Sequence, residues 1–247
     1  MGAGASGASS PPSLWQGTHY FRPDGANDYA QDGNLSASWD FTQAITFGAW
    51  IKFTSSTTFM HPFGDTTAGA TLVGSFGFYT VGGGLRCGIG RNATTMAGWD
   101  FGSVNDNTWR LFTISKPTGA NSNITGYING SQSGSAGIYS SYTPNYTQNI
   151  TIGKRPTLSS GYFAGGIRDA FVIFGYEMNS SEHASLYDPS FKDLSPIISG
   201  LGDAAYYWEF GASGDDATGT TGVFQELLTG TNDLTPYNTL ASALTAL

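Results

Sequence analysis

The chain has 247 residues, of which 35 are Gly and 28 are charged, 10 Lys or Arg and 18 Asp or Glu. A typical globular protein carries about 25% charged residues and about 7% Gly, so this chain has half the usual charge and twice the usual glycine. This composition excludes a helical protein, and the 14% aromatic residues exclude a disordered chain. The net charge of −8, without a cluster of Lys and Arg, argues against nucleic acid and anionic membranes as partners. The length fits one all-β domain.

The chain begins with a Gly-, Ala-, Ser- and Pro-rich segment, residues 1–14, which we expect to be a flexible tail without the basic start and apolar run of a signal peptide. The clearest strand follows at Ala44–Phe53. Its apolar residues alternate with others, which predicts that one face packs on a core and that Trp50 lies on the opposite face. Further strands are predicted around Leu72–Val81, Leu85–Ile89, Trp109–Ile114, Ile124–Ile128, Asn149–Gly153, Phe163–Tyr176 and Ala205–Phe210.

Three local signals add detail to this pattern. The dipeptide Asn129-Gly130 predicts a tight type I′ hairpin turn, because both positions accept positive φ. Asn179 followed by Glu182 three residues later is an Asn version of the capping box and predicts one short helix, which ends at Asp188-Pro189. Cys87 alternates with apolar residues, so we expect a small buried hydrophobe. As a single cysteine it forms no internal disulfide.

The last part of the chain, residues 213–247, is rich in Gly, Asp and Thr before a more apolar end. Leu240, Leu244 and Leu247 have the spacing of a short amphipathic helix, which we expect to dock on the domain or on a partner. We therefore divide the chain into the tail 1–14, a domain at 15–212 and a C-terminal extension at 213–247. Many short strands with one late helix predict a two-sheet antiparallel jelly-roll sandwich.

Several segments in order resemble the laminin-G-like and pentraxin-like branch of the concanavalin A-like jelly rolls, across about residues 17–190. This resemblance implies two packed antiparallel sheets, a structural divalent-metal site in many members, and a concave sheet or loop edge that often binds sugars. It does not fix a function, because functional sites are grafted onto folds. The segments are HYFRPDGANDYAQ (19–31), AITFGAWIKF (44–53), TWRLFTISK (108–116), GYINGS (126–131), ITIGK (150–154) and the stretch from Tyr162 to Asp188.

The resemblance also implies where a metal would bind. By position, the family's metal site corresponds to Asp24 and Asp169, and the expected ion is Ca²⁺, which needs about six to eight oxygen ligands. Arg168 stands where the family usually has its first Asp. Two alternatives therefore stay open. Arg168 pairs with Asp169 in place of the metal, or Asp24 simply caps a turn.

No catalytic residues are predicted, and we expect no enzyme activity. Glycoside hydrolases of this fold need two carboxylates and usually present them on alternate residues of one strand. The chain contains four Glu, and none belongs to such a pattern. The chain has three His but no Gly-x-Ser-x-Gly motif that would supply a nucleophile beside one of them. Neither a zinc-ligand spacing nor a phosphate-binding loop occurs.

Aromatic side chains are the candidates for sugar binding, because sugar faces stack on Trp and Tyr rings. We single out Trp99 and three tyrosines of a Ser- and Asn-rich segment. The alternative for each is ordinary packing within the sandwich. The three tyrosines are Tyr139, Tyr142 and Tyr146.

The low charge, the tail, the C-terminal extension and the ending AAYYWEFGASGDDATGTTGVFQELLTGTNDLTPYNT together resemble laminin-G-like jelly rolls carried on phage and other viral particles. The first hypothesis is therefore a non-enzymatic virion protein, a capsid decoration, head fibre or tail appendage with a glycan-binding face. Its expected partners are coat or tail proteins, further copies of the chain and a host-surface glycan. The alternative is a soluble or cell-surface lectin, extracellular or on the cell surface, and the third hypothesis is a glycoside hydrolase.

Overall fold

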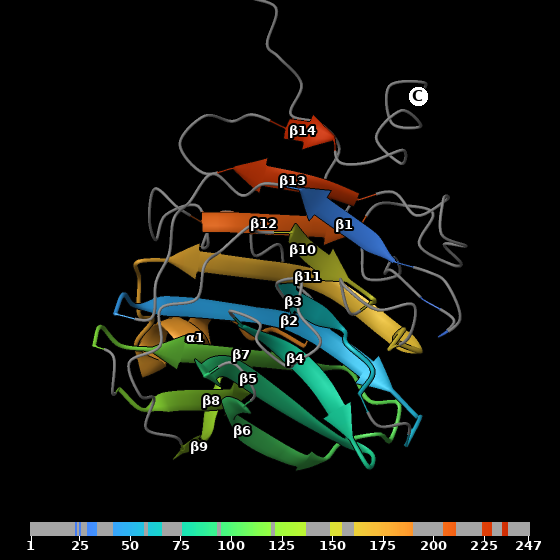
Figure 1. Ribbon diagram of the computed structural model, residues 1–247, viewed down its shortest axis with the longest axis horizontal. Coiled ribbons are helices and arrows are strands. Elements are labelled where there is room, and N and C mark those ends of the chain that lie inside the picture. The colour runs from blue at the N-terminus through green and yellow to red at the C-terminus, as the bar shows by residue number, and fades with distance from the viewer. Residues whose placement is uncertain are drawn as a thin grey trace, which may run out of the picture.

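The structure of the chain, a computed structural model, describes residues 42–56, 59–65, 76–92, 95–119, 122–136, 149–154 and 161–189, the strand residues 30–33, 205–210, 224–228 and 234–236, and also Pro23, Gly25 and Tyr29. Its strands form two antiparallel sheets that pack face to face (Figure 1). The predicted jelly-roll sandwich is confirmed. Among the described residues no helix is long and apolar enough to span a membrane.

One sheet has six strands in the order β1-β10-β3-β4-β5-β6. Its strands β4 and β5 are joined by a tight turn at Gly82 and Gly83, both at positive φ. The bounds are β1 Ala30–Gly33, β3 Phe63–Asp65, β4 Phe76–Val81, β5 Gly84–Asn92, β6 Thr95–Ser103 and β10 Asn149–Ile152.

The other sheet has eight strands in the order β14-β13-β12-β11-β2-β7-β8-β9. The hairpin β8–β9 turns at Asn129 and Gly130, with φ values of 51° and 75°, as the dipeptide predicts. Two strands of this sheet, β13 and β14, fall in the segment 213–247, for which sequence analysis predicted no strand. The bounds are β2 Ile45–Phe53, β7 Arg110–Lys116, β8 Ile124–Ile128, β9 Ser131–Ala136, β11 Gly165–Phe174, β12 Ala205–Phe210, β13 Phe224–Leu228 and β14 Leu234–Pro236.

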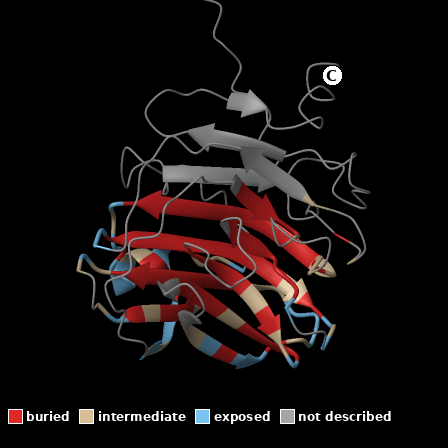
Figure 2. Ribbon diagram, viewed as in Figure 1, coloured by how far each residue is buried: buried red, intermediate tan, exposed pale blue. Residues whose placement is uncertain are grey.

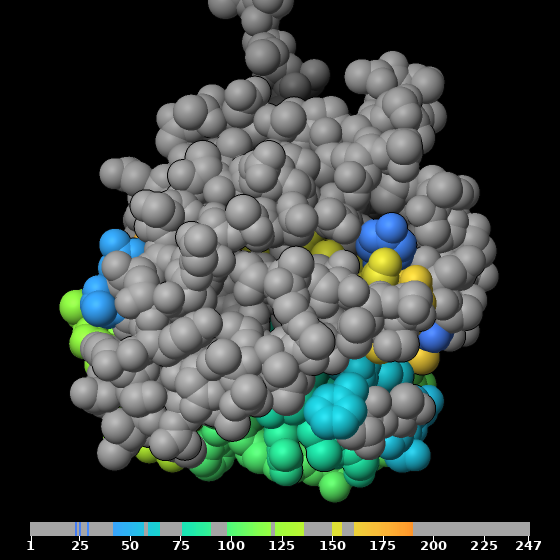
Figure 3. All heavy atoms as spheres, in the orientation of Figure 1, coloured from blue at the N-terminus to red at the C-terminus, as the bar shows by residue number. Residues whose placement is uncertain are grey.

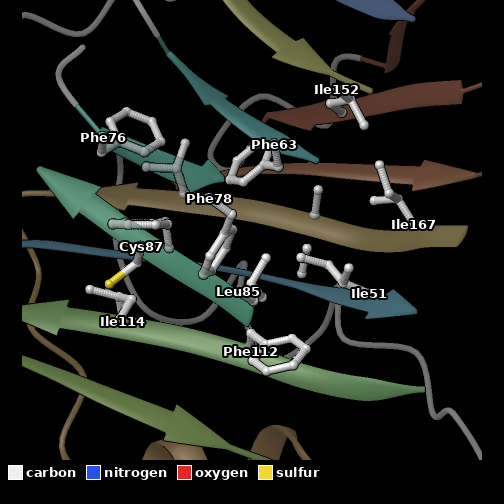
Figure 4. Packing of buried hydrophobic residues seen from close by; sticks show 14 of the residues in the cluster. Ile51, Phe63, Phe76, Phe78, Leu85, Cys87, Phe112, Ile114, Ile152 and Ile167 are labelled. Carbon is white, nitrogen blue, oxygen red and sulfur yellow. The ribbon is translucent and has the colours of Figure 1, made fainter. Parts of the chain in front are cut away.

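The main core lies between the two sheets. Figure 4 shows side chains of both layers in one cluster, including Phe76 and Phe78 of β4, Ile51 of β2 and Phe112 of β7. Each of these side chains is at most 1% exposed. Cys87 belongs to the same cluster, and burial raises the pKa of its thiol to about 12, so it behaves as the predicted small hydrophobe. Figure 2 shows this burial running through the middle strands of both layers.

A second, smaller core covers the opposite face of the eight-stranded sheet, where the helix α1 (Ser180–Leu186) packs. Asn179 caps this helix and forms the predicted capping box with Glu182. Because the helix covers this face, Trp50 is buried there even though it points away from the main core. The members of this second core are Trp50, Leu111, Phe171, Ile173, Met178 and Leu186.

Strand β11 contains a bulge that sequence analysis did not predict. Its register against β2 shifts between Arg168 and Phe171, and Asp169 adopts a left-handed φ of 52°. The extra residue reverses the alternation, so Ile167 before the bulge and Ala170 after it both join the main core. Non-Gly residues with positive φ are uncommon, and Asp is among those that tolerate it best.

Candidate functional site

The outer face of the six-stranded sheet, turned away from the main core, carries three polar side chains in one cross-strand row. Tyr79 of β4 pairs with Arg86 of β5, and Arg86 pairs with Asp100 of β6. The neighbours of each residue along its own strand are buried or pack against the main core, so its side chain points outward. In Figure 3 cyan, teal and green atoms from the first half of the chain reach the surface in the lower part of the visible face.

Arg86 and Asp100 form an ion pair on this face. The guanidinium Nε donates to Asp100 Oδ2 at 2.8 Å, and the other carboxylate oxygen accepts from the backbone N–H of Gly102 at 2.8 Å. The hydrogen bond to Asp100 raises the pKa of Arg86. The two side chains are 42% and 48% exposed, so a ligand can reach both.

Phe59 stands beside this row and is 45% exposed. Among the residues whose side-chain burial the structure describes, no other large apolar side chain is exposed. Its φ of 65° is unusual for a bulky residue. The conformation is held by pairing with the end of β4. Phe59 N–H donates to Thr80 O at 2.7 Å and Thr80 N–H donates to Met60 O at 2.9 Å. Such strain is found mostly at functional sites, and here it presents an aromatic ring to solvent.

Three rings of this face lie nearly parallel. The Phe59 and Tyr79 centroids are 6.4 Å apart with an interplanar angle of 15°, and His61 lies 6.2 Å from Tyr79 at 27°. Burial raises the pKa of Tyr79 more than the nearby Arg86 lowers it, so its hydroxyl stays protonated at neutral pH. We call Phe59, His61, Tyr79, Arg86 and Asp100 the outer-face platform.

The platform combines flat apolar surface with donors and acceptors at its edge. Phe59 and Tyr79 supply ring faces, Arg86 supplies N–H donors and Asp100 supplies carboxylate oxygens. A pyranose ring has an apolar face and hydroxyl groups around its rim, so this arrangement suits it. Asp100 is the one carboxylate of the platform, whereas glycosidic bond hydrolysis needs two.

Trp99, predicted as a sugar-stacking residue, lies on β6 between the two sheets. Its indole Nε1 donates to Ser133 Oγ at 3.3 Å, and its ring lies against Gly126 of β8 and Gly134 of β9, where a Cβ would clash with it. Trp99 therefore closes the sandwich at the β6 and β9 edges. Sugar stacking at Trp99 stays a prediction. Tyr139, Tyr142 and Tyr146 lie outside the described residues.

Asp169, predicted as a calcium ligand, is completely buried and lies 3.2 Å from Arg168 Nε. The guanidinium thus balances the charge of the carboxylate, which is the alternative that sequence analysis left open. Asp24 lies outside the described residues. Within the described part of the chain no group of three or more His, Cys, Asp or Glu side chains is arranged to hold a metal ion. The Asp169 carboxylate is thus already paired with Arg168, and the calcium site at Asp24 and Asp169 stays a prediction.

A Ser–His contact lies under helix α1. His183 Nε2 is 2.6 Å from Ser115 Oγ, and Nδ1 is 2.8 Å from Thr113 Oγ1. The Ser115 hydroxyl donates a hydrogen bond to Met178 O at 3.0 Å. The imidazole must therefore donate to Ser115 through Nε2 and accept from Thr113 through Nδ1. Burial lowers the pKa of His183 to about 3, which keeps it neutral. Both side chains are buried, so this contact anchors the helix and does not face a substrate.

Comparison with known proteins places the chain in a family. The sequence profile of the concanavalin A-like lectin/glucanases superfamily matches residues 24–182, more than half of the chain. The chain belongs to this superfamily. The match covers strands β1 to β11 and the start of helix α1, and it includes every platform residue. A search of curated protein sequences finds no match.

Several solved structures are similar to the chain at low sequence identity. The receptor-binding domain of botulinum neurotoxin D is 12% identical with a TM-score of 0.53, and the alignment covers 85% of this chain and 64% of that chain. The heptameric SAP-like pentraxin from Limulus polyphemus is 16% identical (TM-score 0.45; 65% and 81% covered). Domains LG4-5 of the mouse laminin alpha1 chain are also 16% identical (0.46; 67% and 43%). The chain thus spans less than two thirds of the neurotoxin and laminin chains.

The platform is not evident from the sequence as a set. The alternation in Gly84–Gly90 does place Arg86 opposite the buried Leu85 and Cys87, so its outward direction was predictable. The pairing with Asp100 required the register of β5 and β6. Phe59 lies in a segment without any periodic pattern, and its positive φ has no sequence signal because Phe rarely adopts it.

Proposed function

We propose that the chain is a carbohydrate-binding domain that recognises its ligand on the outer-face platform without catalysing a reaction on it. The observation that carries this proposal is Phe59, an exposed ring held at positive φ beside Tyr79 and the Arg86–Asp100 pair. A strained, exposed aromatic residue costs stability, and binding is the function that compensates for that cost. Membership of a superfamily of lectins and glucanases supports the same class of ligand.

The substitution Phe59→Gly separates binding from folding. Glycine adopts positive φ without steric cost, and relief of about 1–2 kcal/mol of strain offsets the roughly 0.5–1 kcal/mol cost of glycine flexibility. We expect the free energy of unfolding to change by about 1 kcal/mol or less. Binding on a glycan array should weaken roughly three- to tenfold, the scale of one lost ring contact.

Asn107→Gly is the matched control. Asn107 is exposed and has a φ of 60°, but it lies on the loop before β7 and does not belong to the platform. This variant should bind as tightly as the wild type. If Phe59→Gly bound glycans as tightly as the wild type, the platform would not be the binding site. An array without any bound glycan would refute the proposal as a whole.

The placement of the chain on a virion is a second proposal, which rests on its scarcity of charge, 28 residues of 247. Charge is depleted at the cores of protein interfaces, so a poorly charged domain suits a subunit that meets many neighbours, including copies of itself. Quantitative mass spectrometry of purified particles tests this proposal. If the chain were absent from purified particles, its placement on a virion would be contradicted, and the proposal of glycan binding would be unaffected.

A further inference from the structure

The ion pair on the platform sets the charge of the ligand that it can accept. Arg86 Nε and Asp100 Oδ2 are 2.8 Å apart, so the positive and the negative charge cancel at the ligand's position. The guanidinium has five N–H groups, and the bond to Asp100 uses the one on Nε. The pair therefore offers donors and acceptors side by side with no net charge.

An acidic ligand would have to break this balance. A carboxylate or sulfate that bound Arg86 would lie within a few ångströms of the Asp100 carboxylate, and like charges in such contact are costly. Withdrawal of Asp100 would also remove the acceptor of the Gly102 N–H bond. The chain as a whole carries a net charge of −8, so its long-range field repels anions too.

A neutral sugar meets neither obstacle. Adjacent hydroxyl groups of a hexose each donate and accept, so one can accept from Arg86 while its neighbour donates to Asp100. The apolar face of the ring then lies on Phe59 or Tyr79. Resting on the proposed function, we infer that the outer-face platform selects neutral glycans, with adjacent hydroxyls bridging Arg86 and Asp100, over sialylated or sulfated ones.

The test compares matched oligosaccharides by isothermal titration calorimetry with the full chain. One set consists of neutral hexose oligosaccharides, and the other carries the same core with one sialic acid or one sulfate. We expect the acidic set to bind roughly tenfold more weakly, because of the Asp100 charge. Neutral binding should not depend on salt concentration, since no net charge is screened.

The variant Asp100→Asn assigns the discrimination to the platform. It should weaken neutral binding several-fold and reduce or reverse the disadvantage of the acidic set. Asp106→Asn is the matched control. Asp106 lies on the loop before β7 and pairs with Arg110 of β7 at 2.6 Å, so the same change of charge there should leave the preference intact.

The outcomes separate this inference from the proposed function. Acidic glycans that bind as tightly as neutral ones, or neutral binding that falls steeply with salt, would overturn the charge selection while glycan binding stands. A preference that Asp100→Asn does not alter would also overturn it. Failure of every glycan to bind would refute the proposed function, and with it this inference.

Discussion

Arg168 and Asp169 form a buried ion pair in the β11 bulge, with 3% and 0% of their side chains exposed. Removal of one partner leaves a buried charge, so we expect Arg168→Met to lower the free energy of unfolding by about 3–5 kcal/mol. Asn tolerates left-handed φ as well as Asp does. The double variant Arg168→Met/Asp169→Asn should therefore recover part of that loss. Urea denaturation of the two single variants and the double variant measures the coupling, and simple additivity would contradict the pairing.

His183 makes the stability of the fold depend on pH. Its pKa is about 3 in the folded chain, against 6.5 for an unperturbed imidazole, because it is buried. The unfolded chain therefore binds one more proton between these values. Above pH 6.5 the titration of His183 does not reduce the free energy of unfolding. As the pH falls from 6.5 toward 3, this free energy decreases by roughly 1.4 kcal/mol per pH unit.

The variant His183→Gln removes this titration. We expect the difference in unfolding free energy between wild type and variant to shrink as pH falls from 6.5 to 4.5, measured by urea denaturation at each pH. The carboxylates titrate in both proteins and cancel from the difference. A difference that does not change with pH would show that His183 already titrates normally in the folded chain.

At the scale of elements, the β8–β9 hairpin and helix α1 depend on one glycine. Gly130 has a φ of 75°, and a Cβ there would lie 2.8 Å from Ala184 Cα and 3.0 Å from His183 O. Gly130→Ala therefore combines backbone strain with a clash against the helix. Gly82→Ala is the control, because Gly82 has a φ of 57° and open space around it.

We expect Gly82→Ala to cost about 1–2 kcal/mol, the price of left-handed backbone alone. Gly130→Ala should cost measurably more in thermal and urea denaturation, because the helix must shift as well. Equal costs would mean that the helix does not pack on the hairpin as described.

The elements that sequence analysis predicted are those with a strong local signal. The alternation in Ala44–Phe53, the Asn129-Gly130 turn and the Asn179 capping box are all confirmed, because each depends on residues close in sequence. Three strands were not predicted, namely the short strand Phe63–Asp65 and the Gly- and Ser-rich strands β6 and β9. They lack an alternating pattern of apolar residues and are stabilised by pairing with neighbouring strands. The bulge at Asp169 was not predicted either, because it is defined by the pairing of β11 with β2.

At the scale of the whole molecule, the resemblance of ordered segments predicted the fold and the superfamily, and both are confirmed. The candidate site was not predicted, because it joins Phe59, Tyr79, Arg86 and Asp100 from four separate segments. Cross-strand register brings Tyr79, Arg86 and Asp100 into one row, and that register is a property of the folded sheet. The candidates from the sequence, in contrast, rested on residue type for Trp99 and the three tyrosines, and on position within the resembled family for Asp24 and Asp169.

The central claim is that the outer-face platform holds a sugar. A crystal structure of the chain with the neutral oligosaccharide that binds it best tests this claim most directly. We predict a pyranose ring on Phe59 or Tyr79, with adjacent hydroxyls within about 3.2 Å of Arg86 and Asp100. A sugar bound at another surface, with the platform empty, would contradict the account.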